Sequence, residues 1–350
     1  MAPGMARRFP GNAGLRVAQG VLAFWAATAM LVAASQASAA GPGKLADPRP
    51  SDGRAERTVG EWLARMHDAS RQRNYIGTFV VSSSNGSMSS ARIWHACDGV
   101  RQVERIEALS GERRSTFRRD EEVLTFFPET RTVRSERREA LGLFPELLKP
   151  DETAIPEFYK AKRVGSDRVA GFDADIVQVL PKDALRFGYR IWSEKKSGLV
   201  VKLQTVDEAG RVLEQAAFSE LQLDAPVRMD KLAQMMAVPE GWRVEKSDAV
   251  KTTAAAEGWG LKTPVAGFKP TSCYKRTAEG IVQWIFSDGL ASVSLFVEEY
   301  DRQRHVQEGS FASGATHTVT RRVQDWWVTA VGEVPPQTLR AFSLSLERRK

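Results

Sequence analysis

Cysteine, histidine and the short motifs of catalytic sites are scarce in this 350-residue chain. It has two cysteines and four histidines, and no histidine falls into an H-E-x-x-H or other metal-ligand spacing. There is no C-x-x-C pair, no P-loop, no complete G-x-G-x-x-G and no G-x-S-x-G elbow of the kind that activates a nucleophilic serine. We therefore predict no catalytic residue, no metal and no cofactor, and expect that the protein is not an enzyme.

Acidic residues are absent before Asp47. The same stretch carries three arginines, then an apolar run and the small-residue cluster at 37–40, which is the pattern of a secretory signal peptide. A membrane anchor is the alternative, but an apolar core of about 15 residues is short for a bilayer span. Residues 1–39 are therefore predicted to be removed on export, and the residues at 40–56, rich in glycine and proline, to form a flexible leader.

An excess of positive charge is also lacking once the signal peptide is gone. Its removal takes away three arginines and no acid, which lowers the formal net charge from +7 to +4. Basic residues alternate with acids, as in "RRDEEVLTFFPETRTVRSERREA", which indicates solvated strand faces rather than a basic stripe. We predict no binding of nucleic acid.

The remaining chain is long enough for two domains. Thr58 with Glu61 three residues later forms a capping box ahead of an amphipathic pattern, which predicts a helix over 58–73. A two-residue turn at Asn85-Gly86 predicts a β-hairpin. Alternating patterns predict further strands within 100–109, 114–119, 122–129, 130–137, 173–181, 187–193, 198–207 and 211–221.

These strands and the helix predict an α+β fold in which residues 57–224 form one strongly curved sheet with a helix against it. Prolines at 145, 150 and 156 break the segment 140–162 into short helical turns that cover one sheet face. Residues 225–258 show no lasting period and are predicted to be a linker. Residues 259–346 are predicted to form a small α+β domain with hairpins, a break around 307–317, and a closing helix that begins at Pro335-Pro336.

Two serines at alternate positions, Ser292 and Ser294, follow the Asp288-Gly289 pair. A two-residue turn there places Ser287 opposite Leu290. The strand alternation then gathers one wholly apolar face, made of Val282, Trp284, Phe286, Ala291, Val293 and Leu295. The serines lie on the other face with Gln283 and Glu298, so their spacing reflects a sheet rather than a catalytic site.

The cysteines, Cys97 and Cys273, fall in the two different predicted domains. A disulfide requires α-carbons within about 7 Å of each other. An oxidising compartment would permit a bridge, but we predict that the two thiols remain unpaired with each other.

Several stretches resemble the RseB/MucB family of periplasmic regulators. They are "WLARMHDASRQRNYIGTFVV", the run from Asp167 to Leu221, and "SDGLASVSLFVEE" followed by "VTAVGEVPPQTL". The resemblance implies an N-terminal half-barrel similar to the lipoprotein carriers LolA and LolB, followed by a small C-terminal domain. It also implies a place in the periplasm of a Gram-negative cell. The segment "EGWRVEKSDAVKTTAAAEGWGLK" departs from the family pattern.

By the same resemblance, the protein would bind the periplasmic part of a membrane-spanning anti-sigma factor of the RseA/MucA type. It would shield that partner from regulated proteolysis and so restrain an envelope-stress sigma factor of the sigma-E type. A lipid, lipopolysaccharide or mislocalised lipoprotein would act as the displacing signal. Homo-oligomerisation stays open. The alternatives are a periplasmic carrier of lipids or lipoproteins and an unrecognised hydrolase.

Large apolar side chains supply the candidate binding residues, although each type is more often plain core. The candidates for an acyl pocket are Phe79, Phe126, Phe127, Phe144, Leu147 and Trp192. Phe126 and Phe127 are neighbours on a strand and must point to opposite faces. The candidates for partner contact in the C-terminal domain are Leu290, Phe296, Trp326 and Trp327. The two tryptophans also point to opposite faces, so one of them is expected at an interface.

Overall fold

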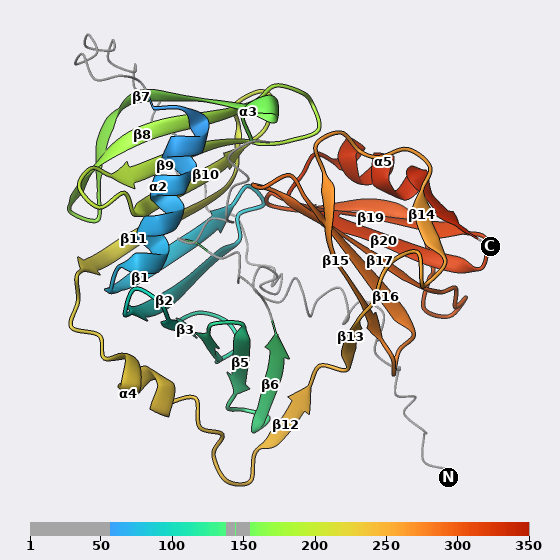
Figure 1. Ribbon diagram of the computed structural model, residues 1–350, viewed down its shortest axis with the longest axis horizontal. Helices are drawn as coiled ribbons and strands as arrows, with labels where there is room; N and C mark the ends of the chain where they lie inside the picture. The colour runs from blue at the N-terminus through green and yellow to red at the C-terminus, as the bar shows by residue number, and fades with distance from the viewer. Residues whose placement is uncertain (1–56, 138–143, 145–154, 350) are drawn as a thin grey trace, which may run out of the picture.

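A curved sheet of 12 strands forms the first domain in the computed structural model, which describes residues 57–137, 144 and 155–349 (Figure 1). In spatial order its strands are β12 (Arg243–Lys246), β6 (Thr132–Arg137), β5 (Glu122–Phe127), β4 (Ser115–Arg119), β3 (Gln102–Ala108), β2 (Met88–Cys97), β1 (Tyr75–Ser83), β11 (Val212–Leu223), β10 (Val200–Val206), β9 (Gly188–Glu194), β8 (Phe172–Pro181) and β7 (Tyr159–Val169). Every neighbouring pair is antiparallel except β12 and β6. The predicted unclosed, curved antiparallel sheet is confirmed.

The helix α2 (Val59–Gln72) packs against one face of this sheet (Figure 1). Its capping box is present, because the Glu61 amide donates to Thr58 Oγ1 and the Thr58 amide donates to the Glu61 carboxylate. Along the helix, Trp62, Leu63 and Met66 recur at helical spacing and are at most 2% exposed. They share a core with apolar side chains of the sheet, so the predicted helix over 58–73 is confirmed to within one residue at each end.

Gly77 on β1 allows α2 and the sheet to share this core, because the Phe218 ring lies directly over its α-carbon. A β-carbon at Gly77 would lie 2.4 Å from Phe218 Cε1 and 2.9 Å from the Glu220 carbonyl oxygen. We expect Gly77→Ala to lower the free energy of unfolding by about 1–3 kcal/mol, since an added methyl group in a close-packed site forces neighbours to shift. Urea denaturation checks this prediction. Gly165→Ala is the control, because the nearest atom to its β-carbon is 3.9 Å away, and an equal loss there would contradict the steric explanation.

The opposite face of the sheet is covered by the segment that follows β11. This segment contains α4 (Met229–Gln234) and Trp242, and its side chains pack on Phe117 and Phe126. It was predicted as a linker without regular structure, but β12 joins the first sheet and β13 (Ala249–Lys251) joins the second. Two residues, Ser247 and Asp248, separate β12 from β13. The Ser247 amide donates to the Ser135 carbonyl of the first domain, and the Asp248 carboxylate accepts from the Ala278 amide of the second.

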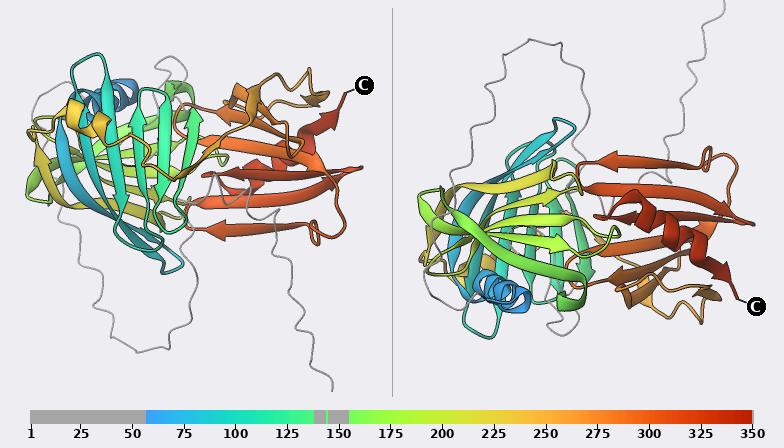
Figure 2. Two further views of the ribbon diagram at one scale, coloured as in Figure 1. Left: turned by 90° about the horizontal axis from the view of Figure 1, so that it is seen from below. Right: turned by 90° about the horizontal axis from the view of Figure 1, so that it is seen from above.

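The second domain is a sheet of seven strands with one helix on one face (Figure 2). Its order is β13, β15 (Lys269–Arg276), β16 (Ile281–Ser287), β17 (Ser292–Glu299), β20 (Trp326–Gly332), β19 (Thr316–Val323) and β18 (Gly309–Ser313). Helix α5 (Pro336–Ser345) begins at the predicted proline pair and buries Leu339 and Phe342 against the sheet. A small pair, β14 (Trp259–Leu261) and β21 (Leu346–Arg348), closes the end of this domain. The predicted small α+β domain is confirmed.

Both predicted two-residue turns are wrong by a small shift, for one physical reason. Ser82 lies opposite Met88 and Ser287 lies opposite Ser292, so the loops are longer than expected. In each loop an Asn or Asp side chain accepts a hydrogen bond from the backbone amide two residues later. This bond keeps the loop residues from pairing between the two strands. The second shift is two residues, so the predicted apolar and polar faces of β16 and β17 are retained.

Strands β7 and β18 also lie where no strand was predicted. The helical turn α3 (Ile155–Phe158) leads into β7, an edge strand with mostly exposed, charged side chains that give no alternating pattern. β18 occupies part of the predicted break at 307–317. Cys97 and Cys273 are free thiols in different domains, as predicted. Over the described residues, no helix has the length and apolar character needed to cross a membrane.

Candidate functional site

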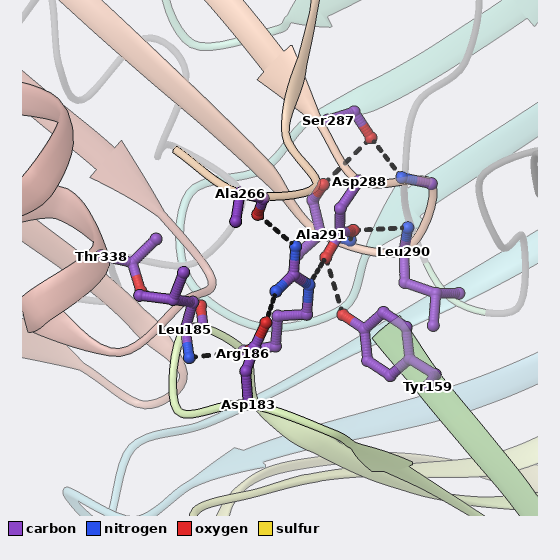
Figure 3. A network of polar contacts seen from close by, with 11 residues as sticks. Tyr159, Asp183, Leu185, Arg186, Ala266, Ser287, Asp288, Leu290, Ala291 and Thr338 are labelled. Atoms are coloured by element: carbon purple, nitrogen blue, oxygen red, sulfur yellow. Dashed lines mark hydrogen bonds and ion pairs between the residues drawn. The ribbon is translucent and has the colours of Figure 1, made fainter. Parts of the chain in front are cut away.

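The two domains meet through a buried polar network centred on Asp288 (Figure 3). Arg186, from the loop between β8 and β9 of the first domain, donates from Nε to Asp288 Oδ2 at 2.8 Å. Tyr159 Oη, at the start of β7, donates to the same oxygen at 2.8 Å. The side chains of Arg186 and Asp288 are both fully buried. An ion pair without solvent contact therefore joins the domains.

The local turn explains why a carboxylate at position 288 is buried without losing hydrogen bonds. Asp288 Oδ1 accepts from the amides of Leu290 at 2.9 Å and Ala291 at 2.8 Å. Together with Tyr159 and Arg186, these donors give the carboxylate four hydrogen bonds. Full hydrogen bonding is the condition under which a buried charge is tolerated. The Asp-Gly turn of the sequence is thus the second domain's half of the contact.

Arg186 is held equally completely. Its guanidinium also bonds Asp183 and donates to the Ala266 carbonyl at 2.6 Å. Its central carbon lies 4.3 Å from the Phe158 ring centroid and 4.9 Å from that of Phe268, so aromatic rings of both domains cover it. A planar guanidinium satisfies this combination of bonds and ring contacts, and a lysine ammonium does not.

Hydrogen bonds from α5 to the two backbone carbonyls that precede Arg186 extend the interface. Thr338 Oγ1 on α5 donates to the Leu185 carbonyl at 2.7 Å, and Gln337 Nε2 donates to the Ala184 carbonyl at 2.7 Å. Leu185 packs on the core of the second domain, whereas Leu290 packs on the core of the first. Each domain therefore inserts one apolar side chain into the other. Burial raises the pKa of the Tyr159 phenol, so Tyr159 stays a hydrogen-bond donor at neutral pH.

The candidate acyl-pocket residues do not gather at one place. The Phe144 ring lies 5.5 Å from Phe79 and 5.0 Å from Phe218, between centroids, on the α2 side of the sheet. Phe126 lies on the opposite face, under Trp242 and against Phe117. Phe127 points to the α2 side, where the Arg134 guanidinium covers its ring.

The other two pocket candidates add little to this cluster. Trp192 is 5% exposed, beneath the Lys202 ammonium, and donates from Nε1 to Asp167. Ile191, the residue before Trp192, is the cross-strand partner of Leu203, and both lie on the sheet face that carries Phe218. Trp192 pairs with Lys202 instead. Leu147 lies outside the described residues. Phe79, Phe144 and Phe218 therefore form one aromatic cluster, in which each residue is at most 5% exposed.

The candidate partner contacts are more buried than a simple docking surface requires. Phe296 is 4% exposed and clusters with Ile281 and Val331, and Trp327 is 6% exposed and stacks on His305 at 4.8 Å. Leu290 is part of the interdomain contact described above. Trp326 keeps partial exposure, with the Arg348 guanidinium 4.9 Å from its ring. Of the tryptophan pair, Trp326 is the one nearer to solvent.

The described residues contain neither a metal cluster nor an activated thiol. Among the described residues, no group of three or more His, Cys, Asp or Glu side chains has the geometry to hold a metal. Burial raises the pKa of both thiols, to about 11 for Cys273, so neither is an activated nucleophile. The interdomain role of Arg186 and Asp288 was missed from the sequence, where Asp288 was a turn residue and Arg186 belonged to no motif.

Comparison with known proteins assigns the chain to a family. The family model for the MucB/RseB N-terminal domain matches residues 58–236, and the model for the MucB/RseB C-terminal domain matches residues 253–347. The chain belongs to the MucB/RseB family. The predicted resemblance is thereby confirmed over both domains, and the boundary between the two matches falls near β13.

Relatives in the MucB/RseB family match over most of their length. The sigma factor AlgU regulatory protein MucB of Pseudomonas aeruginosa is 31% identical over 82% of this chain and 90% of that protein. The sigma-E factor regulatory protein RseB of Escherichia coli K12 is 26% identical over 82% and 90%. The structure of the Pseudomonas aeruginosa MucA/MucB complex is similar with a TM-score of 0.64 at 27% identity, covering 83% of this chain and 99% of that chain. Another solved structure in this group contains MucB with MucA(peri).

Proposed function

We propose that this protein is a periplasmic negative regulator of a sigma-E-type envelope stress response. It binds the periplasmic region of a membrane anti-sigma factor of the RseA/MucA type and protects that region from regulated proteolysis. The observation that carries the proposal is the likeness of both domains, in the same order, to a MucB chain solved together with MucA. The N-terminal sequence pattern supports export with cleavage near Ala39 or Ala40.

The proposal includes a lipid-bearing signal that opposes partner binding. Its support here is the buried aromatic cluster of Phe79, Phe144 and Phe218 on the α2 side of the sheet, where an acyl chain would take the place of the Phe144 ring. If an acyl chain bound at this cluster lowers the affinity for the partner, then the bound partner lowers the affinity for the acyl chain by the same factor. Couplings of this kind are about 1–3 kcal/mol.

The proposal assigns partner contact to the C-terminal domain, with Trp326 as its first candidate because the ring keeps partial exposure. The chain from Ala40 to Lys350 is expected to bind the periplasmic segment of the anti-sigma factor saturably and to slow its first proteolytic cut. We expect Trp326→Ala to weaken binding about tenfold or more, since tryptophan is enriched among the interface residues whose truncation costs about 2 kcal/mol or more. Titration calorimetry measures the affinity.

The matched control is Leu344→Ala, which removes an apolar side chain that is 61% exposed on α5. This variant is expected to bind like the unaltered chain. Failure of the unaltered chain to bind the segment would refute the regulator proposal. Equal losses in the two variants would remove Trp326 from the contact and leave the regulator proposal standing.

A further inference from the structure

A second contact between the domains is built on carboxylates without a paired cation at its centre. Glu214, the third residue of β11, is 8% exposed and is the cross-strand partner of Ser83 on β1 and Thr205 on β10. Its side chain faces the turn between β18 and β19 of the second domain. That turn lies beside the tip of the β1–β2 hairpin, where Asn85 Nδ2 is 3.4 Å from Ser313 Oγ (Figure 2).

The turn between β18 and β19 packs directly against the Glu214 carboxyl. Ser83 Oγ donates to Glu214 Oε2 at 3.3 Å, and the Ala315 backbone amide also bonds the carboxyl. Gly314 has φ of +59°, and a β-carbon there would lie 2.7 Å from Glu214 Oε2. Ala315 is fully buried. Among the described residues, the second domain therefore covers Glu214 without placing a positive charge against it.

The charged group that acts on Glu214 is another carboxyl, Glu333, at the end of β20. Burial raises the pKa of the Tyr189 phenol, and the negative charges of Asp288 and Glu333 raise it further, whereas the positive charge of Arg186 lowers it. His317 on β19 lies next to the turn, with Nδ1 3.1 Å from the Ala315 carbonyl, and its ring packs on Phe187. Two acids, one histidine and a phenol thus share this side of the interface.

We propose that Glu214 and the β18–β19 turn form a docking contact between the two domains that closes on the neutral carboxyl and opens as the medium becomes alkaline. The negative charges of Glu214 and Glu333 repel each other, and this repulsion disfavours ionisation of both carboxyls together. A proton on Glu214 relieves the repulsion from Glu333 and the cost of burying a charge. When the proton leaves, opening the turn returns the carboxylate to water.

The direction of the pH effect follows from the burial. Burial and Glu333 raise the pKa of Glu214 from its usual 4.5 to about 8, and burial raises the pKa of Glu333 as well. The stabilisation that Glu214 contributes to the closed contact is therefore complete below pH 4.5, and it is lost as the pH rises to about 8. Burial lowers the pKa of His317 below its usual 6.5, so protonation of His317 weakens the contact only on the acid side. A comparison between pH 6.5 and pH 8.5 isolates the carboxyl effect.

Hydrogen exchange of the full chain tests the proposal, because it measures even rare local opening. After correction for intrinsic exchange rates, the protection of the amides at 313–316 is expected to fall roughly 20-fold from pH 6.5 to pH 8.5, the change that this shift in one carboxyl produces. Amides in α2 and α5 serve as references for each domain and are expected to keep their protection. Glu214→Gln, which is neutral at every pH, is expected to abolish the fall, and Glu333→Gln to reduce it.

Three outcomes would overturn the proposal. These are constant protection of 313–316 in the unaltered chain, an undiminished fall in Glu214→Gln, or an equal fall in the reference helices. None of them depends on the anti-sigma partner, so this test is independent of the proposed function.

Discussion

Replacing Arg186 with alanine is expected to lower the free energy of unfolding by about 3–5 kcal/mol, because it leaves the Asp288 carboxylate buried and without its charged partner. Both side chains are fully buried, so solvent does not compensate the remaining charge. Urea denaturation followed by tryptophan fluorescence measures the loss. We expect the domains to separate before either one unfolds, since the pair joins them.

Arg163→Ala is the matched control for this prediction. Arg163 pairs with Asp175 at 2.9 Å, nearly the distance of the Arg186 pair, but its side chain is 43% exposed. An exposed pair of this kind contributes about 0–1 kcal/mol. The double variant of Arg186→Met with Asp288→Asn removes both charges and is expected to recover part of the loss. Similar losses in Arg186→Ala and Arg163→Ala would show that burial of the pair has no energetic consequence.

Replacing Phe144 with alanine is expected to raise the affinity for an acyl probe by about 10- to 100-fold. The ring fills the space against Phe79 and Phe218, and an acyl chain must displace it. Exposing a buried phenylalanine costs about 1.5–3 kcal/mol, which the variant no longer has to overcome. An apolar cavity of this kind binds apolar ligands. Titration of a fluorescent fatty acid measures the change.

Phe126→Ala is the control, because Phe126 is 7% exposed and Phe144 is 5% exposed, yet they lie on opposite sheet faces. Each variant is expected to lose about 3–5 kcal/mol of stability, so both are checked for folding before titration. Unchanged probe affinity in Phe144→Ala would contradict the proposal that lipid binds at this cluster. An equal gain in Phe126→Ala would show that the effect comes from general loosening.

The features that follow from local rules were predictable from the sequence. The helix α2 is specified by Thr58, Glu61 and the spacing of its apolar residues, and α5 by its proline pair. Strands with one buried face, such as β1, alternate strictly and were found. β7 was not found, because an edge strand with exposed side chains on both faces carries no such alternation.

The interdomain site was not predictable because its partners come from distant parts of the chain. Tyr159, Arg186 and Asp288 each satisfy an ordinary local pattern, and their burial arises only when the domains dock. Turn registers also escaped prediction, because an Asp or Asn side chain competes with the ladder for backbone amides. The split of the pocket candidates follows from strand pairing, which places Phe79 of β1 and Phe126 of β5 on opposite faces of the sheet.

The two residues between β12 and β13 limit how the domains can move. Ser247 is bonded to the first domain and Asp248 to the second, and two residues span at most about 7 Å when fully extended. At this point the domains cannot slide apart unless a strand peels from its sheet. Any reorientation that breaks the Arg186 and Glu214 contacts must therefore swing about the peptide unit between Ser247 and Asp248. Ser247 and Asp248 therefore form a single hinge between the two domains, and the Arg186 and Glu214 contacts hold the domains together away from that hinge.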